Sequence, residues 1–389
     1  MENEQIFPFS SSAWNAAVTI ICRGGILVGG VASIIAGLLY VKQDALLYFP
    51  EIGNIGRRTG QNPRRYRSPA EHNIPYETHM IRCEDGVSIH SWLLLHPNAR
   101  QERLPTILFF HGNAGNIGLR LPNAIQMFHY LKANVLLVEY RGYGDSDDAK
   151  PSESGLKLDA EAALRFISEH PQIDAKRIFI FGRSLGGAVS FHLAQYAENN
   201  SIPVAGVIVE NTFISIAKMV DHLMPLVAPL KPLVLRIGWD SGRAVTQIKT
   251  PVLYLAGSAD QLVPHSHMQE LFHRSEKASV SARMHIIKDG THNETWLQGG
   301  KQYWHTIRGF FDEIFAAEKS GAFTRNPSIS ESADVWNSYG SRSKVAVGMG
   351  MESENLKSSS IPTMPSNLIG MAKNASAASA PKETGKKEI

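Results

Sequence analysis

The chain has 389 residues, a formal net charge of +3 and an apolar fraction of 43%. These values predict a globular protein that can bury a sizeable core, and they exclude a chain dominated by disorder. No long basic run is interleaved with aromatic residues, which argues against a nucleic-acid partner, and the two cysteines, Cys22 and Cys83, provide neither a disulfide framework nor a metal-ligand spacing.

The N-terminal region predicts a single membrane anchor. A polar segment, residues 1–15, precedes an apolar stretch, residues 16–41, whose only charge is Arg23. Its uncharged part, residues 24–41, has 18 residues, within the ~17 to 25 needed to cross a bilayer. The alternatives are a cleaved signal peptide, which usually begins with cations that are absent here, and a buried core helix, which this glycine-rich and uniformly apolar stretch fits poorly. We therefore expect a single-pass protein with the lipid bilayer as a partner.

The positive-inside rule makes a prediction about orientation. Lys42, Arg57 and Arg58 follow the apolar stretch within about 20 residues, whereas only Arg23 lies on its other side. This bias predicts that the large C-terminal part of the chain lies in the cytosol.

Residues 42–316 predict one α/β domain. Short apolar runs with strand character alternate with segments of helical periodicity, which favours a mostly parallel sheet covered by helices on both faces. Residues 213–247 interrupt this alternation with a stretch rich in Pro, Leu and Met, which we interpret as a short lid, or alternatively as an irregular helical connection. Residues 317–389 lose apolar periodicity and predict a disordered tail. The expected strands lie within Val87–Leu95, Pro105–Gly112, Asn134–Gly142, Arg177–Ser184, Val204–Asn211, Thr250–Asp260 and Ala282–His292.

One serine lies between two glycines where a strand-like run meets a helical pattern. The residues Gly182-Arg183-Ser184-Leu185-Gly186 form the pattern G-x-S-x-G, after IFIF and before GAVSFHLA. A serine at the tip of a sharp strand-to-helix turn needs small neighbours, because a Cβ two residues to either side would crowd the turn. This context predicts that Ser184 is a nucleophile, and the alternative is an ordinary turn.

A serine hydroxyl needs a base and a carboxylate to become nucleophilic, and in this class of sheet the acid precedes the histidine along the chain. Asp260, at the end of a strand-like run, is the expected acid, and Asp289 is its competitor. His292, in a glycine-containing loop after the next run, is the expected base. The other candidate histidines are His265, His267 and His285.

The oxyanion formed during attack needs backbone N–H donors. We expect one from Leu185, immediately after the serine, and one from Asn113 in the loop HGNAGN, residues 111–116. This loop also suits an ordinary turn, because Gly and Asn tolerate positive φ. No phosphate-binding glycine pattern follows the strand, so the sequence predicts no nucleotide site.

The motifs FFHGNAGN, VEYRGYGDSD, FGRSLGGAV, AGSADQLVP and GTHNETW resemble the α/β-hydrolase superfamily and, with the N-terminal apolar stretch, its Bem-type membrane-anchored branch. The resemblance covers roughly residues 42–316. It implies a serine hydrolase with Ser184, Asp260 and His292 as its triad. It also implies a catalytic domain on the lumenal or extracellular side, opposite to the charge bias.

We therefore expect a membrane-anchored serine hydrolase that cleaves an ester, thioester or amide through an acyl-enzyme, without metal or organic cofactor. The apolar lid beside an anchor favours an acyl or lipid-like substrate. Related membrane-associated hydrolases with HGN and YRGYG motifs remove acyl groups from protein cysteines, so the resemblance makes the chain a candidate palmitoyl hydrolase, whereas a peptidase is less favoured. The alternative is a catalytically silent, membrane-tethered scaffold that keeps the fold.

Overall fold

A single twisted sheet organises the folded part of the chain. The computed structural model describes residues 11–320. Within them, eight strands run in the order β1-β2-β4-β3-β5-β6-β7-β8. β2 lies antiparallel to both of its neighbours, and β3 to β8 are parallel to one another. The strands are β1 Tyr76–Arg82, β2 Ser88–Leu94, β3 Thr106–Phe110, β4 Asn134–Val138, β5 Ile178–Arg183, β6 Gly206–Glu210, β7 Val252–Gly257 and β8 Ala282–Ile287.

The central strands are uniformly apolar because both faces of the sheet are covered. In β5, Ile178 and Ile180 pack into the core on one face, and Phe179 and Phe181 pack into the core on the other. This alternation follows from the two-residue period of a strand. All the parallel strands end at the same edge of the sheet, so the loops that follow them meet there.

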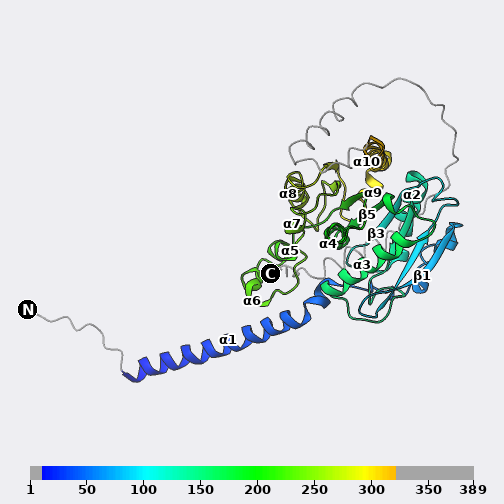
Figure 1. Ribbon diagram of the computed structural model, residues 1–389. Coiled ribbons are helices and arrows are strands. Elements are labelled where there is room, and N and C mark those ends of the chain that lie inside the picture. Colours follow the sequence, from blue (N-terminus) through cyan, green and yellow to red (C-terminus); the bar gives the residue numbers. More distant parts are fainter. Residues whose placement is uncertain (1–10, 321–389) are drawn as a thin grey trace, which may run out of the picture.

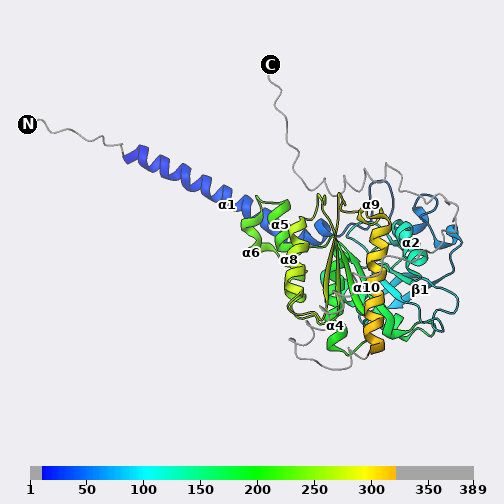
Figure 2. The same ribbon diagram turned by 90° about the horizontal axis from the view of Figure 1, so that it is seen from above.

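Helices form a layer on each face of the sheet (Figures 1 and 2). α3, α4 and α8 contribute to the core on one face, and α2 and α10 contribute to the core on the other. The expected α/β architecture, a mostly parallel sheet flanked by helices, is confirmed. The helices are α1 Ser11–Leu47, α2 Leu121–Leu131, α3 Glu153–Glu169, α4 Leu185–Asn199, α5 Ile216–Leu223, α6 Lys231–Val234, α7 Ser241–Ala244, α8 His265–Ser275, α9 Thr295–Gln298 and α10 Gly300–Ser320.

The edge strand β1 was not among the expected strands. Its sequence YETHMIR contains only one buried side chain, Ile81, so it lacks the apolar run by which the other strands were found. It is held instead by its antiparallel register with β2, in which Tyr76 pairs with Leu94 and Arg82 pairs with Ser88. Strands at the edge of a sheet need few buried residues, because one side of the ladder and part of one face remain open.

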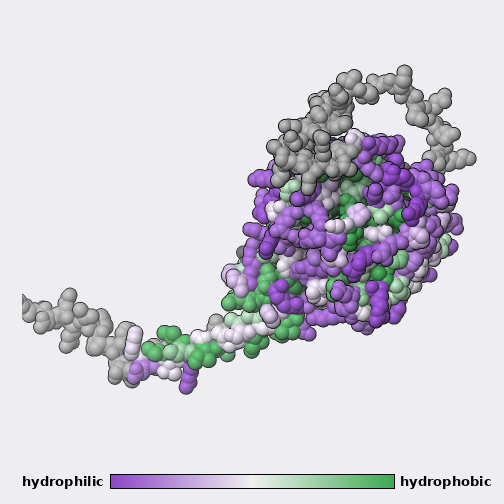
Figure 3. Space-filling model, viewed as in Figure 1, coloured by the Kyte–Doolittle hydropathy of each residue, from purple (hydrophilic) through white to green (hydrophobic). Residues whose placement is uncertain are grey.

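α1 projects from the domain as a long apolar helix (Figures 1 and 3). It contains the whole of the stretch 16–41 and is long and apolar enough to cross a membrane. Side chains such as Ile26, 75% exposed, and Leu38 contact little else in the described protein. An exposed apolar helix of this length is a candidate membrane span, as the sequence predicted.

Residues 213–247, which we call the lid segment, contain α5, α6 and α7. They leave the sheet after β6 and return to it at β7. At the C-terminal end, α10 continues through Ser320, so residues 317–320 are helical rather than part of the expected tail. Residues 1–10 and 321–389 lie outside the described residues, and the predictions made for them stay predictions.

Candidate active site

Ser184 lies at the turn between β5 and α4 with strained backbone angles. Its φ is 54° and its ψ is −119°, and it is the N-cap residue of α4. A non-glycine residue rarely adopts positive φ, and such strain is retained only where surrounding contacts enforce it. The two glycines permit the turn: a Cβ on Gly182 would overlap the backbone of Gly186, and a Cβ on Gly186 would overlap the carbonyl of Phe110.

The loop after β6 fixes the backbone of this turn from one side. The N–H of Ser184 donates to the carbonyl of Glu210 at 2.9 Å, and the Thr212 hydroxyl donates to the carbonyl of Ser184 at 2.8 Å. The Glu210 side chain is fully buried and pairs with Arg183 and with the hydroxyl of Tyr303. This buried ion pair lies directly under the serine turn and leaves it little freedom to rearrange.

Asp260 and His292 form a direct hydrogen bond. The Nδ1 of His292 lies 2.7 Å from Oδ2 of Asp260. Oδ1 of Asp260 accepts from the N–H groups of Leu262 and Val263 at 2.8 and 2.9 Å, which orients the carboxylate. Because an ionised carboxylate only accepts hydrogen bonds, Nδ1 carries the ring proton and Nε2 of the neutral imidazole keeps its lone pair.

Asn211 joins the serine turn to the histidine loop. Its side-chain amide donates to the carbonyl of His292 at 3.0 Å and to the hydroxyl of Thr295 at 2.9 Å, and its Oδ1 accepts from the N–H of Gly257 at 2.8 Å. Its two chain neighbours are the residues that hold the backbone of Ser184. Residues 210–212 therefore contact the turn after β5, the end of β7 and the loop after β8. This role of Asn211 was not predicted, although an asparagine directly after a buried strand is a signal that could have drawn attention to it.

Replacing Asn211 by alanine is expected to lower both stability and turnover. The change leaves buried backbone groups without partners, which costs about 1 to 3 kcal/mol for each group. We expect a loss of about 3 kcal/mol in the free energy of unfolding, measured by denaturant titration. Asn200→Ala at the exposed end of α4 is the matched control and should cost little, and an equal loss in both variants would contradict a special role for Asn211.

The two expected oxyanion donors lie near this turn. Within residues 11–320, the backbone N–H groups of Leu185 and Asn113 donate to no protein acceptor. Leu185 begins α4, where N–H groups point away from the helix and favour negative charge. The Cβ of Ser184 would contact a Cβ placed on Gly112 at 3.6 Å, so the loop 111–116 lies against the serine. Neither N–H is therefore used by an acceptor within the described protein.

The end of α1 supports the loop that contains Asn113. The Asn113 side-chain amide donates to the carbonyl of Leu47 at 2.9 Å. The N–H of Phe49 donates to the carbonyl of Asn113, and the N–H of Gly115 donates to the carbonyl of Phe49, both at 2.9 Å. Tyr143 adds a hydrogen bond from its hydroxyl to the same Asn113 carbonyl at 2.7 Å. No sequence pattern predicts this contact, because the two segments lie far apart along the chain.

The competing acid and bases have other surroundings. Asp289 is exposed at a positive-φ turn, where its N–H donates to the Ser258 hydroxyl. His265 and His267 belong to the first turn of α8, and His285 lies within β8. None of these histidines is hydrogen-bonded to Asp260 within the described residues. Their positions suit surface or packing roles better than that of the base.

The site is almost closed to solvent. Ser184 is 7% exposed and His292 is 8% exposed. The surface hollow between β8 and α10, lined by residues such as Arg283 and Glu313, does not include either of them. Both residues thus lie largely beneath the surface and keep a small exposed area.

His111, the first residue of the loop 111–116, is fully buried. Its Nε2 is 3.2 Å from Oε1 of Glu139, and its Nδ1 is 2.7 Å from the carbonyl of Gly112. Burial lowers the pKa of His111, which disfavours the charged imidazolium. Its contacts identify it as part of the support for the loop rather than as a competing base.

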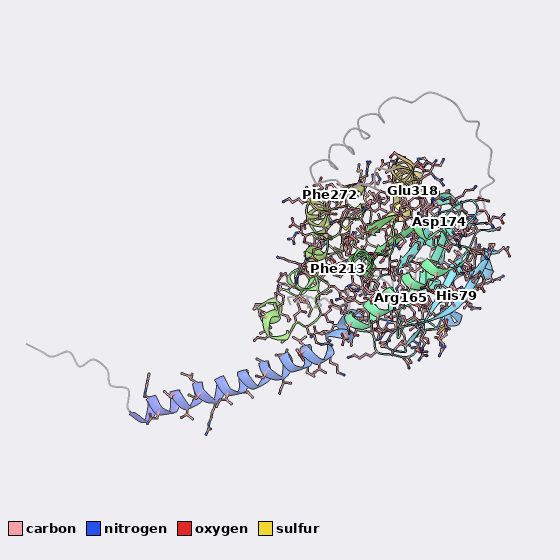
Figure 4. The ribbon with its side chains drawn as sticks, in the orientation of Figure 1. His79, Arg165, Asp174, Phe213, Phe272 and Glu318 are labelled. Atoms are coloured by element: carbon pink, nitrogen blue, oxygen red, sulfur yellow. The ribbon has the colours of Figure 1, made fainter. Side chains whose placement is uncertain are left out.

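A group of three possible metal ligands lies elsewhere. Glu77 Oε2 is 2.9 Å from Nε2 of His79 and 3.1 Å from Nε2 of His170. The Nδ1 of His170 faces the N–H of Gln172 at 3.3 Å, so the neutral ring carries its proton on Nε2 and donates it to Glu77. Figure 4 places His79 far from Phe213, which follows the loop that holds Ser184. Hydrogen bonding accounts for this cluster without a metal ion.

A parallel sheet with a serine at a positive-φ turn before a helix defines the α/β-hydrolase class. Residues 105–237 match the family model described as the alpha/beta hydrolase fold, a range that contains Ser184 but neither Asp260 nor His292. The chain belongs to the α/β-hydrolase family, in the branch that contains the two relatives described next.

Two relatives cover most of the described domain. The alpha/beta hydrolase domain-containing protein WAV2 of Arabidopsis thaliana is 38% identical over 76% of this chain and 94% of its own length. Protein bem46 of Schizosaccharomyces pombe is 35% identical over 78% of this chain and 97% of its own length. A relative in Saccharomyces cerevisiae, named an uncharacterized membrane protein, is 33% identical over 63% of this chain and 83% of its own length.

Solved structures share the fold at lower identity. An esterase of Pyrococcus furiosus has a TM-score of 0.52 and 20% identity, over 63% of this chain and 95% of that protein. An alpha-beta hydrolase of Vibrio vulnificus has a TM-score of 0.52 and 21% identity, over 72% of this chain and 93% of that protein. At this identity the likeness concerns the fold alone.

Proposed function

We propose that this chain is a membrane-anchored serine hydrolase in which Ser184, His292 and Asp260 form a catalytic triad. The observation that carries the proposal is the strained backbone of Ser184 together with the 2.7 Å contact between His292 and Asp260. The loop of residues 210–212 holds both halves of this arrangement. Family membership and the esterase fold neighbour support a hydrolase of this general kind.

In the first half of the reaction, the hydroxyl of Ser184 attacks the carbonyl carbon of the substrate, and Nε2 of His292 takes its proton. Asp260 stabilises the resulting imidazolium and keeps the ring in the useful orientation. The N–H groups of Leu185 and Asn113 donate to the oxygen on which negative charge develops. The attack produces a tetrahedral intermediate. When this intermediate collapses, the bond to the leaving group breaks, and the leaving group receives the proton from His292.

In the second half, water hydrolyses the acyl group bound to Ser184. His292 takes a proton from the water, and the hydroxide equivalent attacks the acyl carbonyl in the same oxyanion site. The bond between the acyl carbon and Oγ of Ser184 then breaks, and His292 returns the proton to Oγ, so the acid is released and the serine hydroxyl is restored. The cycle needs only water besides groups of the chain, so we propose no cofactor.

The proposed substrate is an ester, thioester or amide of an acyl or lipid-like molecule. Residues 16–41 are the proposed anchor, residues 42–316 the catalytic domain, and residues 213–247 its lid. The apolar character of the lid segment and its place beside α1 support a substrate with an apolar part, since a pocket next to a bilayer meets such molecules at high local concentration.

A fluorophosphonate probe tests the proposal on the full-length protein in detergent micelles. Such a probe reacts with an activated serine, so we expect one covalent adduct, which peptide mass spectrometry should place on Ser184. Denatured protein is the control, because an unactivated serine should not react. A folded protein that forms no adduct would instead support the silent scaffold, and an adduct on another serine would contradict the triad.

A further inference from the structure

The lid segment carries an unusually apolar tip. Residues 224–235, which we call the lid tip, read MPLVAPLKPLVL and contain a single charged residue. Among the described side chains, Leu226 and Leu233 are the two most exposed large apolar ones, at 89% and 78%. The one charge, on Lys231, is paired with Asp221. Large apolar side chains are rarely grouped in this way on a surface that faces water, and such a patch usually marks a contact with a membrane or another protein.

The lid tip is attached to α1 by specific polar contacts. The side chain of Gln43 donates to the carbonyl of Val234 at 3.0 Å and accepts from the N–H groups of Arg236 and Ile237, each at 3.0 Å. Asp44 forms an ion pair with Arg236. A second charge, on Lys150, also pairs with Asp44 at 3.0 Å. These contacts fix the position of the lid tip along the axis of α1.

At this position along the axis, the lid tip lies beside the last residues of the predicted membrane span. Ala36 and Leu39 are half-buried and Gln43 is buried, all on one face of α1, whereas residues 37, 38 and 40–42 are exposed. α6 packs against α1, and both ribbon views show α6 beside the part of α1 nearest the domain. Ala36 lies five residues before Val41, the end of the predicted span, which corresponds to about 7 Å along the helix axis.

An overlap of this size matches the depth at which apolar segments lie in a bilayer interface, about 5 to 10 Å. Figure 3 shows the apolar surface of α1 continuing onto the domain where the lid segment lies. The pairs formed by Asp44, Arg236 and Lys150 lie just beyond this surface, at the level where charged groups meet the lipid headgroups. The bilayer that surrounds α1 therefore also meets the lid tip.

We propose that the lid tip, residues 224–235, is a second membrane-contacting surface that inserts Leu226 and Leu233 into the lipid beside α1. The inference rests on the anchoring part of the proposed function and not on the catalytic triad.

Depth-dependent fluorescence quenching tests the proposal with the full-length protein in phosphatidylcholine nanodiscs. An environment-sensitive dye is attached to a cysteine at Leu226→Cys or Leu233→Cys, in a Cys22→Ala background. The remaining cysteine, Cys83, is buried, and burial raises the pKa of its thiol to about 12, so it reacts poorly with the dye. Leu27→Cys on α1 reports the anchor, and Met80→Cys on the exposed edge strand reports the aqueous side.

Lipids that carry nitroxide quenchers high on their acyl chains should remove most of the fluorescence of the lid-tip labels, and deep quenchers should remove less. The Leu27→Cys label should show the opposite order, and the Met80→Cys label should lose little. A quenched α1 label with an unquenched lid-tip label would overturn the inference while leaving the anchor intact. A lid-tip label shielded from water but not quenched by lipid would overturn it in favour of a protein partner or a second copy, and no quenching at either site would overturn the anchor as well.

Discussion

Ser184→Ala is expected to lower kcat by about 10⁴ to 10⁶-fold while leaving KM within a few fold, because it removes the nucleophile but not the binding surface. The residual rate above that in water comes from the oxyanion donors and from substrate positioning. The measurement is hydrolysis of a short-chain p-nitrophenyl ester by the purified full-length protein. The same variant should form no adduct with the fluorophosphonate probe.

Ser168→Ala is the matched control for this change. Ser168 lies in α3, and its hydroxyl has no hydrogen-bond partner within the described part of the chain, so its loss should change neither folding nor turnover. Thermal unfolding of both variants separates chemistry from stability. Turnover by Ser184→Ala at more than a few per cent of the wild-type rate would mean that another residue is the nucleophile.

Asp260→Asn is expected to lower kcat by about 10⁴-fold without unfolding the domain. The Asn oxygen can still accept from the N–H groups of Leu262 and Val263, so the loop keeps its shape. The new amide donates to Nδ1 of His292, which moves the ring proton to Nε2. In that tautomer the imidazole has no lone pair with which to take the proton of Ser184.

Asp289→Asn provides the control for the acid. Asp289 was the competing candidate, and it lies exposed at a positive-φ turn that asparagine adopts readily. Its variant should keep wild-type turnover and stability. If Asp289→Asn lost activity while Asp260→Asn retained it, the assignment of the acid would be reversed.

The sequence predicted the fold wherever burial left a pattern in the residue types. Strands covered on both faces, such as β5 and β7, are continuous apolar runs, and seven of the eight strands lay within expected ranges. β1 could not be found in this way, because pairing with β2 holds it and only Ile81 is buried. Backbone hydrogen bonds to a neighbouring strand leave no trace in side-chain composition.

The candidate site was predictable where chain geometry dictates residue type. The turn at Ser184 demands glycine at positions 182 and 186, and this demand is visible in the sequence. The position of Asn211 directly after a buried strand was a signal, but its partners, like the contact between Leu47 and Asn113, depend on which segments meet in three dimensions. Polar residues that connect distant loops have no fixed spacing by which they could be recognised.

The hydrogen bonds between the end of α1 and the loop around Asn113 determine where the chain can be shortened for soluble production. A fragment that starts at Lys42 keeps the Leu47 carbonyl and the Phe49 backbone, and with them the support of that loop. A fragment that starts at Gly53 lacks both, even though every residue of the sheet remains. Proteolytic cleavage between Phe49 and Gly53 would therefore leave every strand of the sheet in place and remove the hydrogen bonds that support the proposed oxyanion loop.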